Sequence, residues 1–407
     1  MEEVLVIRCL DILNNIFAFN HLDNCNRISR FLENVVYINN LTETKNLIIL
    51  NEFINKNKKI FIEIDPAYLF NSAISNKIFV DLPKLDKHLK ILINNKNSFL
   101  LMNFMREQLP HDEYIIPLLY TLQKYPELKN RILYITNLDI NDELTRVSNL
   151  IGLSADGLIC YNFNYFELDC YFNNIENNVT RSSNKEKLFL SLNTKPEKPN
   201  RLNMALYLNK YNLFNEGYFS LRKSYKYDAS EAKQSIFDDL VDQFYSFSKK
   251  WDNLVIRQDL DEINNHIDRK GTWSGYPYPI ELYNKSYISI IAETHFKFNR
   301  SVFLTEKTYR TIFYEHPFIM LGPPNSLTAL RSLGYITFAP IINEEYDVEE
   351  SDYKRLCSGL ENLINNKKQI IERYNELLDI SKHNKNILIK NSQKSISSIK
   401  NIFKGLR

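Results

Sequence analysis

The sequence predicts an α/β protein with two domains, each built on a parallel β-sheet. Short apolar segments typical of strands alternate with segments of helical periodicity along most of the chain. This alternation is the pattern of parallel strands joined by crossover helices. The length of 407 residues suits two domains, and the polar residues 179–186 read as the linker between them. We therefore expect two Rossmann-like domains.

The first domain is expected over residues 1–180. Helical periodicity is clearest at residues 46–54 and 114–124. The candidate strands are apolar runs at residues 4–7, 35–38, 59–64, 99–104, 131–136 and 158–161. Ligands of such sheets bind at the carboxyl ends of the strands, so polar residues that directly follow a strand are the first candidates for function.

The second domain is expected over residues 181–382. A helix is expected at residues 201–211, a longer one at 229–250, and an irregular segment at 251–278. Long irregular segments inside compact domains are often functional. The candidate strands are residues 188–193, 217–221, 286–292 and 317–321, and one more after Gly334.

Local signals fix the ends of two helices in the second domain. Thr305 is placed to cap the first helix with its side-chain hydroxyl. His316 stands before Pro317 and ends that helix. Gly334 is the expected left-handed residue that ends the second helix.

The composition favours a cytoplasmic protein with large apolar cores. Hydrophobic residues make up 44% of the chain, and the net charge of +2 gives no general attraction to nucleic acid. Five cysteines without a CxxC spacing are typical of reduced thiols. We see no signal peptide and no apolar run of the ~18 residues that a membrane span needs.

Two charged residues stand in the first turn of the helix that follows Thr305. A helix N-terminus favours anions, and Lys307 there suits a pyrophosphate. Glu306 suits a ribose, because a carboxylate accepts hydrogen bonds from two hydroxyls. These residues indicate a nucleoside-diphosphate site. The alternative is an exposed first turn in which Glu306 only complements the helix dipole.

Two blocks of the chain resemble the donor-site blocks of the α-1,3-fucosyltransferases. That family has a tyrosine-lysine strand, a Glu-Asn-Ser end and a Tyr-Val-Thr-Glu-Lys helix start, and this chain has YNKSYISIIAETHF and then VFLTEKTYRTIF. The family also has a strand that ends in Ser-Asn before a helix opened by arginine. Here LFLSLN ends at Asn193, and Arg201 follows. Related glycosyltransferase sequences of phages and bacteria share these blocks, and the resemblance covers residues 187–338.

The resemblance implies a GT-B glycosyltransferase, whose two Rossmann-like domains face a cleft and whose second domain binds the nucleotide sugar. Arg201 and Lys307 would neutralise the diphosphate, so that neither a metal ion nor a cofactor beyond the nucleotide-sugar co-substrate is implied. For Arg201 the alternative is a surface cation. The implied donor-binding residues are Asn193, Arg201, Glu293, Thr294, Phe303, Thr305, Glu306 and Lys307.

The chain departs from the family at two places. Phe303 replaces the tyrosine before the Thr-Glu-Lys core, which removes a hydroxyl. The Glu-Asn-Ser end is Glu293-Thr294-His295, which removes an amide. Hexosyl and fucosyl transfer therefore both stay open, and GDP-fucose is not assumed.

An inverting transfer needs a base that takes the proton from the acceptor hydroxyl. Carboxylates that follow strands of the first domain are expected to face the cleft. Glu107, after the strand at residues 99–104, is the first choice; Asp65 and Asp139 have the same placement after their own strands, and nothing in the sequence ranks the three firmly. Each has the alternative of a helix cap or turn carboxylate. His111 and His316 are further polar candidates, although His316 is explained more simply as a helix end.

Short aspartate patterns are the only sequence feature that suggests a metal ion. Asp259-Leu260-Asp261 and the related residues 139–142 have the spacing that holds Mn²⁺ or Mg²⁺ in other glycosyltransferases. Two such short patterns are close to chance in a chain rich in aspartate. We predict that no metal is used.

Residues 383–407 predict a basic amphipathic helix. From Ser381 onward the chain has no acidic residue, while isoleucines recur at helical spacing. One interpretation packs this helix across the first domain, as GT-B folds commonly do. The other makes it a peripheral anchor at the inner face of a membrane.

The leading prediction is a glycosyltransferase that moves a sugar from a nucleoside diphosphate to an acceptor hydroxyl. The acceptor classes are glycans, lipid-linked sugars and modified DNA bases, and the near-neutral charge gives DNA little support. The alternative is a non-catalytic nucleotide-binding or scaffold protein with a degenerate GT-B site. A phosphate-ester hydrolase is disfavoured, since the sequence shows neither a nucleophile motif nor a metal cluster.

Overall fold

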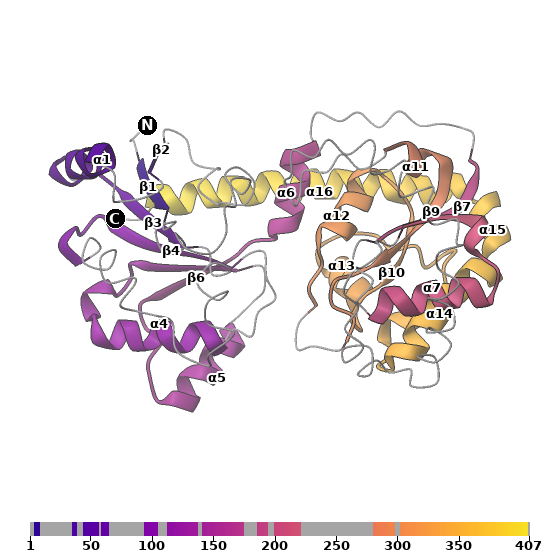
Figure 1. Cartoon of the computed structure of the whole chain (residues 1–407), viewed down its shortest axis with the longest axis horizontal. Coiled ribbons are helices and arrows are strands. Elements are labelled where there is room, and N and C mark those ends of the chain that lie inside the picture. Colours follow the sequence, from indigo (N-terminus) through magenta and orange to yellow (C-terminus); the bar gives the residue numbers. More distant parts are fainter. Residues whose placement is uncertain are drawn as a thin grey trace. The chain divides into compact units, whose positions relative to one another are not determined.

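The computed structural model describes residues 4–8, 35–38, 44–56, 58–64, 93–104, 112–136, 141–174, 185–193, 199–220, 280–297 and 302–405. The chain divides into two compact units, Met1–Tyr165 with Gln393–Arg407, and Phe166–Ser392. Each unit contains its own parallel sheet with accompanying helices (Figure 1). The fold class is α/β with two Rossmann-like domains, as the sequence predicts. By this division the first unit ends at Tyr165, ahead of the boundary expected near residue 180.

The sheet of the first unit has the strand order β2-β1-β3-β4-β5-β6. All neighbouring strands are parallel. The order changes direction at β1, which lies between β2 and β3, so a topological switch point lies between β1 and β3. The strands are β1 Val4–Arg8, β2 Val35–Ile38, β3 Ile60–Ile64, β4 Ser98–Phe104, β5 Ile132–Thr136 and β6 Leu158–Asn162.

The core of the first unit is built on strands covered on both faces. Every residue of β5 is buried, which is why its sequence is a continuous apolar run rather than an alternating one. The helices α4 and α5 pack against each other (Figure 1). The helices of this unit are α1 Thr44–Asn55, α4 Asp112–Lys124, the short 3-10 helix η3 Pro126–Leu128, and α5 Asn141–Ile151.

The sheet of the second unit has the strand order β10-β9-β7-β8. Its neighbouring strands are also parallel. The chain continues from β7 to β8 on one side and from β9 to β10 on the other, so the switch point of this sheet lies between β7 and β9. The strands are β7 Lys187–Leu192, β8 Gly217–Ser220, β9 Ser286–Ala292 and β10 Phe318–Leu321.

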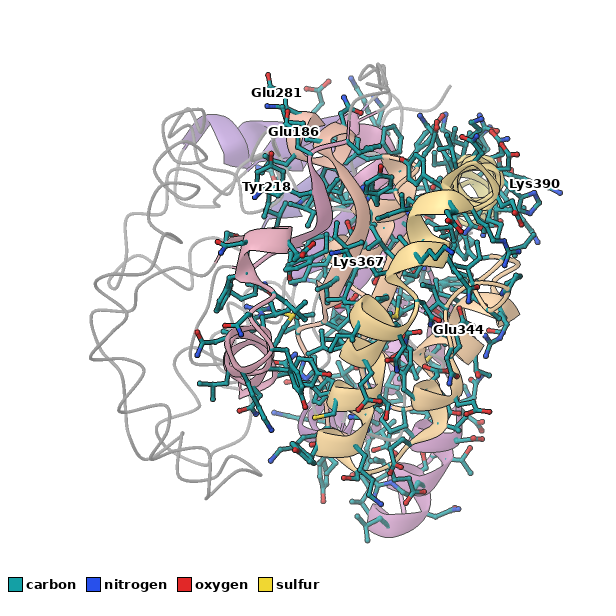
Figure 2. All side chains as sticks on the ribbon, turned by 90° about the vertical axis from the view of Figure 1, so that its right-hand side faces the viewer. Glu186, Tyr218, Glu281, Glu344, Lys367 and Lys390 are labelled. Atoms are coloured by element: carbon teal, nitrogen blue, oxygen red, sulfur yellow. The ribbon has the colours of Figure 1, made fainter. Side chains whose placement is uncertain are left out.

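The helices of the second unit complete its layers around this sheet (Figure 1). They are α6 Tyr165–Asn174, α7 Pro199–Lys210, η4 Phe214–Glu216, α11 Ile280–Lys285, α12 Glu306–Phe313, α13 Ser326–Ser332, η6 Glu345–Val348, α14 Asp352–Asn365, α15 Lys367–Glu372 and the part of α16 (Tyr374–Gly405) that ends at Ser392. At the amino ends of β7 and β8 the sheet edge is polar. There the Tyr218 hydroxyl donates to Glu186 at 2.8 Å, and the two side chains lie together in Figure 2.

The strand expected after Gly334 does not form. Gly334 itself ends α13 with the predicted left-handed backbone, at a φ of 91°. Beyond it residues 335–338 have no regular secondary structure, and the side chain of Asn384 on α16 binds both backbone groups of Ile336, with N–O distances of 2.8 and 2.7 Å. A side-chain amide thus supplies the hydrogen bonds that a neighbouring strand would have given.

The C-terminal helix is longer than the predicted residues 383–407. It starts at Tyr374 and continues to Gly405 without a break. Leu388 and Ile399 are fully buried, and within the first unit Lys59 Nζ donates to the carbonyl oxygen of Lys404 at 3.3 Å. These contacts agree with the packing interpretation, while membrane contact stays a prediction. None of the helices in the described ranges combines the length and the hydropathy needed to cross a membrane.

Candidate functional site

The candidate site lies at the switch point of the second sheet, where β7 and β9 end side by side. Asn193 directly follows β7, and Glu293 directly follows β9. Because the two strands are parallel neighbours, both residues stand at the carboxyl edge of the sheet. Open α/β sheets bind ligands at this edge and at this point of their topology.

Asn193 leaves an unused acceptor at the end of β7. Its Nδ2 donates to the Ser191 hydroxyl at 3.0 Å, while that hydroxyl donates to the carbonyl oxygen of Ile290 at 3.1 Å. The Ser191 proton is therefore committed, which fixes the orientation of the Asn193 amide. Asn193 is 4% exposed, and its Oδ1 has no hydrogen-bond partner among the described residues. Buried acceptors are usually hydrogen-bonded, so we expect Asn193 Oδ1 to accept from a donor that is not among the described residues.

Glu293 is a buried carboxylate that ties the end of β9 to the start of α12. It has no exposed surface. Its Oε1 accepts from the Thr305 backbone N–H at 3.1 Å and from the Thr308 hydroxyl at 2.5 Å. Its Oε2 accepts from the Thr305 hydroxyl at 2.5 Å and from the Thr294 N–H at 3.2 Å. Four hydrogen bonds offset the cost of burying the charge.

Thr305 occupies the N-cap position of α12, as predicted, but the predicted side-chain cap is wrong. Its backbone is extended, and its hydroxyl makes no capping hydrogen bond. The hydroxyl instead donates to Glu293 and accepts from Lys307 Nζ at 3.2 Å. The first turn is closed by the backbone, since Thr308 and Tyr309 both donate to the Thr305 carbonyl.

The first turn of α12 presents Glu306 and Lys307. Lys307 Nζ donates to the Thr294 hydroxyl at 3.0 Å, the Thr305 hydroxyl at 3.2 Å and Glu306 Oε1 at 2.8 Å. An ammonium group has three N–H donors, so all three are in use. The side chains of Lys307 and Glu306 are 15% and 27% exposed.

The Glu306 carboxyl is ionised at any working pH. Burial acts to raise its pKa, but the charges of Lys307 and Arg310 and the hydrogen bond from Lys307 outweigh burial and lower the pKa to about 2. The first turn of α12 thus carries a fixed ion pair rather than two independent solvated charges. This arrangement differs from the exposed-turn alternative for these residues.

Arg201 is buried near the start of α7, which begins at Pro199. Only 3% of the residue is exposed, so the surface-cation alternative is wrong. The neighbouring Asn200 Nδ2 donates to the carbonyl oxygen of Glu293 at 3.0 Å. This hydrogen bond joins the start of α7 to the end of β9, and it brings the second predicted helix start to the same edge of the sheet.

Phe303 packs inside the protein beside the site. It is 3% exposed, and its ring meets the rings of Phe166 and His295 edge-on at 5.6 and 5.8 Å between centroids. The apolar packing accounts for a phenylalanine at this position. His295, on the other hand, keeps some exposure beside Thr294.

Arg355 is an essential support of the site that sequence reasoning missed. It is 1% exposed on α14 and donates to the carbonyl oxygens of Phe296 and Gly322 at 2.5 and 2.9 Å, as well as to Asp352 at 2.6 Å. It therefore ties together the loops that follow β9 and β10. The available signal was an arginine within the apolar stripe of the α14 sequence, between Asp352 and Leu356.

His316 belongs to the opposite edge of the same sheet. Its Nε2 bonds the carbonyl oxygen of Ser286 at 2.9 Å, and its Nδ1 bonds the Ser289 hydroxyl at 2.8 Å. Ser286 opens β9, whereas the candidate site stands where β9 closes. With both ring nitrogens bonded and 1% exposure, His316 is a structural residue of the sheet.

Several sequence candidates lie outside the described residues. They are Glu107, Asp65, Asp139, His111, Asp259 and Asp261, together with residues 229–250 and 251–278. Within the described ranges, no group of three potential metal ligands comes together.

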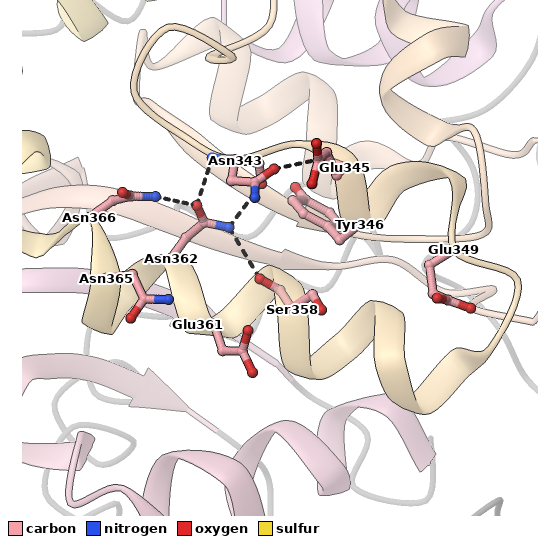
Figure 3. Close-up of a pocket in the computed structure, with 9 residues that line it drawn as sticks. All are labelled: Asn343, Glu345, Tyr346, Glu349, Ser358, Glu361, Asn362, Asn365 and Asn366. Carbon is pink, nitrogen blue, oxygen red and sulfur yellow. Dashed lines mark hydrogen bonds between the residues drawn. The ribbon is translucent and has the colours of Figure 1, made fainter.

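A hollow that contains none of the candidate-site residues lies between η6 and α14 (Figure 3). It has a volume of about 370 Å³. Asn362 lies at its centre with its amide already used, since Nδ2 donates to the carbonyl oxygen of Asn343 and Oδ1 accepts from Asn366. The hollow is thus lined by side chains that hold η6 on α14.

Comparison with known proteins gives distant matches only. No family model and no curated protein matches the chain. An α,α-trehalose-phosphate synthase (UDP-forming) from Burkholderia vietnamiensis is 9% identical with a TM-score of 0.37, over 98% of this chain and 100% of that one. A structure described as trehalose-6-phosphate from E. coli bound with UDP-2-fluoro glucose is 10% identical with a TM-score of 0.36, over 98% and 99%. Neither is described as a fucosyltransferase, and the fold class given above rests on the strand topology.

Proposed function

We propose that the protein is a GT-B glycosyltransferase that transfers a sugar from a nucleoside diphosphate to an acceptor hydroxyl. The observation that carries this proposal is the switch point between β7 and β9. There the described residues bring together Asn193, Glu293 and the start of α12, with the start of α7 joined to the same edge. A helix N-terminus with a lysine at this place in an α/β sheet suits the phosphates of a nucleotide.

The donor would be held by charge at its diphosphate and by hydrogen bonds elsewhere. Lys307 and Arg201 supply positive charge. This charge stabilises the leaving diphosphate more strongly as negative charge builds up on it. Glu306, ionised under all working conditions, accepts from ribose hydroxyls. The unused Oδ1 of Asn193 accepts from a donor group of the ligand. The nucleotide sugar is then a co-substrate, without a metal ion or further cofactor.

The acceptor hydroxyl would be deprotonated by a carboxylate of the first domain, giving inversion. Glu107, Asp65 and Asp139 follow the strands β4, β3 and β5 along the chain. Of these strands, β3 is the one at the switch point of its sheet, which favours Asp65. The acceptor is a glycan, a lipid-linked sugar or a modified DNA base, and lipid acceptors would give the basic helix α16 a peripheral membrane role.

A nucleotide-sugar screen tests the proposal. The protein is titrated with UDP-, GDP-, CMP- and dTDP-linked sugars, and both the midpoint of thermal unfolding and the release of sugar are measured. We expect one nucleotide class to raise the midpoint and to be turned over. Stabilisation without any sugar release, with all acceptor classes supplied, would favour the non-catalytic nucleotide-binding alternative. No stabilisation by any nucleotide would contradict both.

A further inference from the structure

Glu293 receives hydrogen bonds from two threonine hydroxyls that are alike in burial and in the length of the bond they donate. Thr305 and Thr308 are 2% and 0% exposed, and each donates to a different oxygen of Glu293 at 2.5 Å. Only the Thr305 hydroxyl also contacts Lys307, whose Nζ lies 3.2 Å away.

The direction of each hydrogen bond in this chain of three groups is fixed by chemistry. A lysine ammonium can only donate, and an ionised carboxylate can only accept. The Thr305 hydroxyl has one proton, which goes to Glu293, and its lone pair then faces Lys307. If Glu293 could not accept that proton, the Thr305 hydroxyl could rotate and point the proton toward Lys307. The hydroxyl would then no longer accept a hydrogen bond from the Lys307 ammonium group.

We propose that Glu293 is a positioning residue that acts through the Thr305 hydroxyl to aim the Lys307 ammonium at a bound diphosphate. This inference rests on the proposed function, because it takes Lys307 as the group that meets the phosphates. Glu293 itself has no exposed surface and touches no ligand. Its carboxylate sets the proton on Thr305, and Thr305 with Thr294 sets the place of Lys307.

The test compares Thr305→Val with Thr308→Val, which serves as the matched control. Each variant removes one buried hydroxyl from Glu293 and keeps a β-branched side chain, so the loss of stability should be similar. The readout is the Kd of inorganic pyrophosphate by calorimetry, together with the thermal midpoint. We expect Thr305→Val to weaken pyrophosphate binding by about tenfold, the effect of losing one hydrogen bond to a charged group. Thr308→Val should stay within about twofold, and Thr305→Ser should restore wild-type binding.

Lys307→Ala in the same assay separates the positioning role of Glu293 from the proposed phosphate site at the start of α12. If Lys307→Ala weakens pyrophosphate but the two valine variants behave alike, Glu293 only stabilises the loop and the positioning role is wrong. If Lys307→Ala leaves pyrophosphate binding unchanged, the start of α12 is not a phosphate site, and the donor site of the proposed function fails with it. A Thr305→Val variant that does not fold is replaced by Thr305→Ala, with Thr308→Ala as its control.

Discussion

At the scale of single residues, the site depends on charges whose partners are fixed. Lys307 is bonded to two hydroxyls and one carboxylate, and the carboxylate of Glu293 accepts four hydrogen bonds from groups of its own loop and helix. Preorganised charges of this kind stabilise a transition state without reorganising during the reaction. They also cost stability, because each charge is partly or wholly removed from water.

Lys307→Ala should act mainly on the rate of the chemical step. The charge on the diphosphate grows as the sugar leaves, so Lys307 contributes more to the transition state than to the ground state. We expect kcat at saturating donor to fall by ~10² or more, the range for losing one preorganised electrostatic donor. Steady-state kinetics measure this, with circular dichroism to establish that the variant is folded. A folded variant with wild-type kcat would return Lys307 to the role of a solvated first-turn residue.

Glu167 on α6 is a buried carboxylate that makes stability depend on pH. Burial raises its pKa to about 7 against hydrogen bonds from Tyr335 and Asn391, which act to lower it. The other titratable groups near Tyr335 are Tyr309 and Cys170. The pKa of Glu167 in the folded protein thus lies above the ordinary value of 4.5 for a glutamate. Stability is therefore full below about pH 4.5, and it is lost as the pH rises through about 7.

Glu167→Gln should remove this loss. Glutamine keeps an oxygen that accepts from Tyr335 and Asn391 but carries no charge. We expect the variant to match the wild type in unfolding free energy at pH 5 and to exceed it by about 1–3 kcal/mol at pH 8, since each unit of pKa shift corresponds to about 1.4 kcal/mol. Urea denaturation at both pH values measures the difference, and parallel pH curves for the two proteins would contradict the assignment.

At the scale of elements, the loops at the carboxyl edge of the second sheet are held by α14. Arg355 bonds the loops after β9 and β10 through backbone carbonyls, and Gly322 in the second loop has no room for a side chain. A Cβ there would lie 2.5 Å from the Ser326 hydroxyl. The start of α12 is therefore set by a helix far along the chain.

Arg355→Ala should destabilise the second unit strongly. The change leaves several carbonyls and the Asp352 carboxylate without their donor, and breaking a buried pair in this way typically costs about 3–5 kcal/mol. Urea denaturation gives the value. Arg373→Ala is the control, because Arg373 and Glu376 form an ion pair whose side chains are 37% and 58% exposed, and such pairs contribute about 1 kcal/mol or less. Similar losses for both variants would show that Arg355 does not hold the loops.

Local patterns were sufficient to predict most elements but not the contacts between them. The predicted bounds of β2 and β9 agree with the structure, because each is an apolar run with clear ends. The hydroxyl of Thr305 was predicted to cap its own helix, yet it bonds Glu293, twelve residues earlier in the chain. The backbone N–H of Ile336 bonds Asn384, far along the chain, and the role of Arg355 depends on loops that precede it. Periodicity carries no information about such distant partners.

At the scale of the whole molecule, the chain passes between its two units twice. The division falls between Tyr165 and Phe166, and again between Ser392 and Gln393. The two crossings leave the second unit together, since Asn391 Nδ2 donates to Glu167 Oε1 at 3.1 Å and the Ser392 hydroxyl donates to the Glu167 carbonyl at 3.4 Å. The first crossing thus falls at the start of α6, and the second falls within α16.

Chelators should leave the transfer reaction intact. The ammonium group of Lys307 stands at the candidate site, and we expect activity in EDTA to stay within about twofold of the untreated enzyme. Activity lost in EDTA and restored by Mn²⁺ would contradict this expectation. In that case Asp259 and Asp261, outside the described residues, would become the candidates for a metal site.

The full set of acceptors on Lys307 has a consequence for the lifetime of a complex. A phosphate oxygen can bind this ammonium group only by displacing one of its three present acceptors. Glu306 is more exposed than Lys307, its partner in the ion pair. If Lys307 meets the phosphates as proposed, Glu306 competes with them for the ammonium group, and we expect it to limit affinity and to hasten the departure of the diphosphate after reaction. Glu306→Gln should bind inorganic pyrophosphate about two- to fivefold more tightly, mainly through slower dissociation in stopped-flow measurements. Faster dissociation would mean that Glu306 supports the bound phosphates instead. In that case the return of Glu306 to Lys307 would not speed product release.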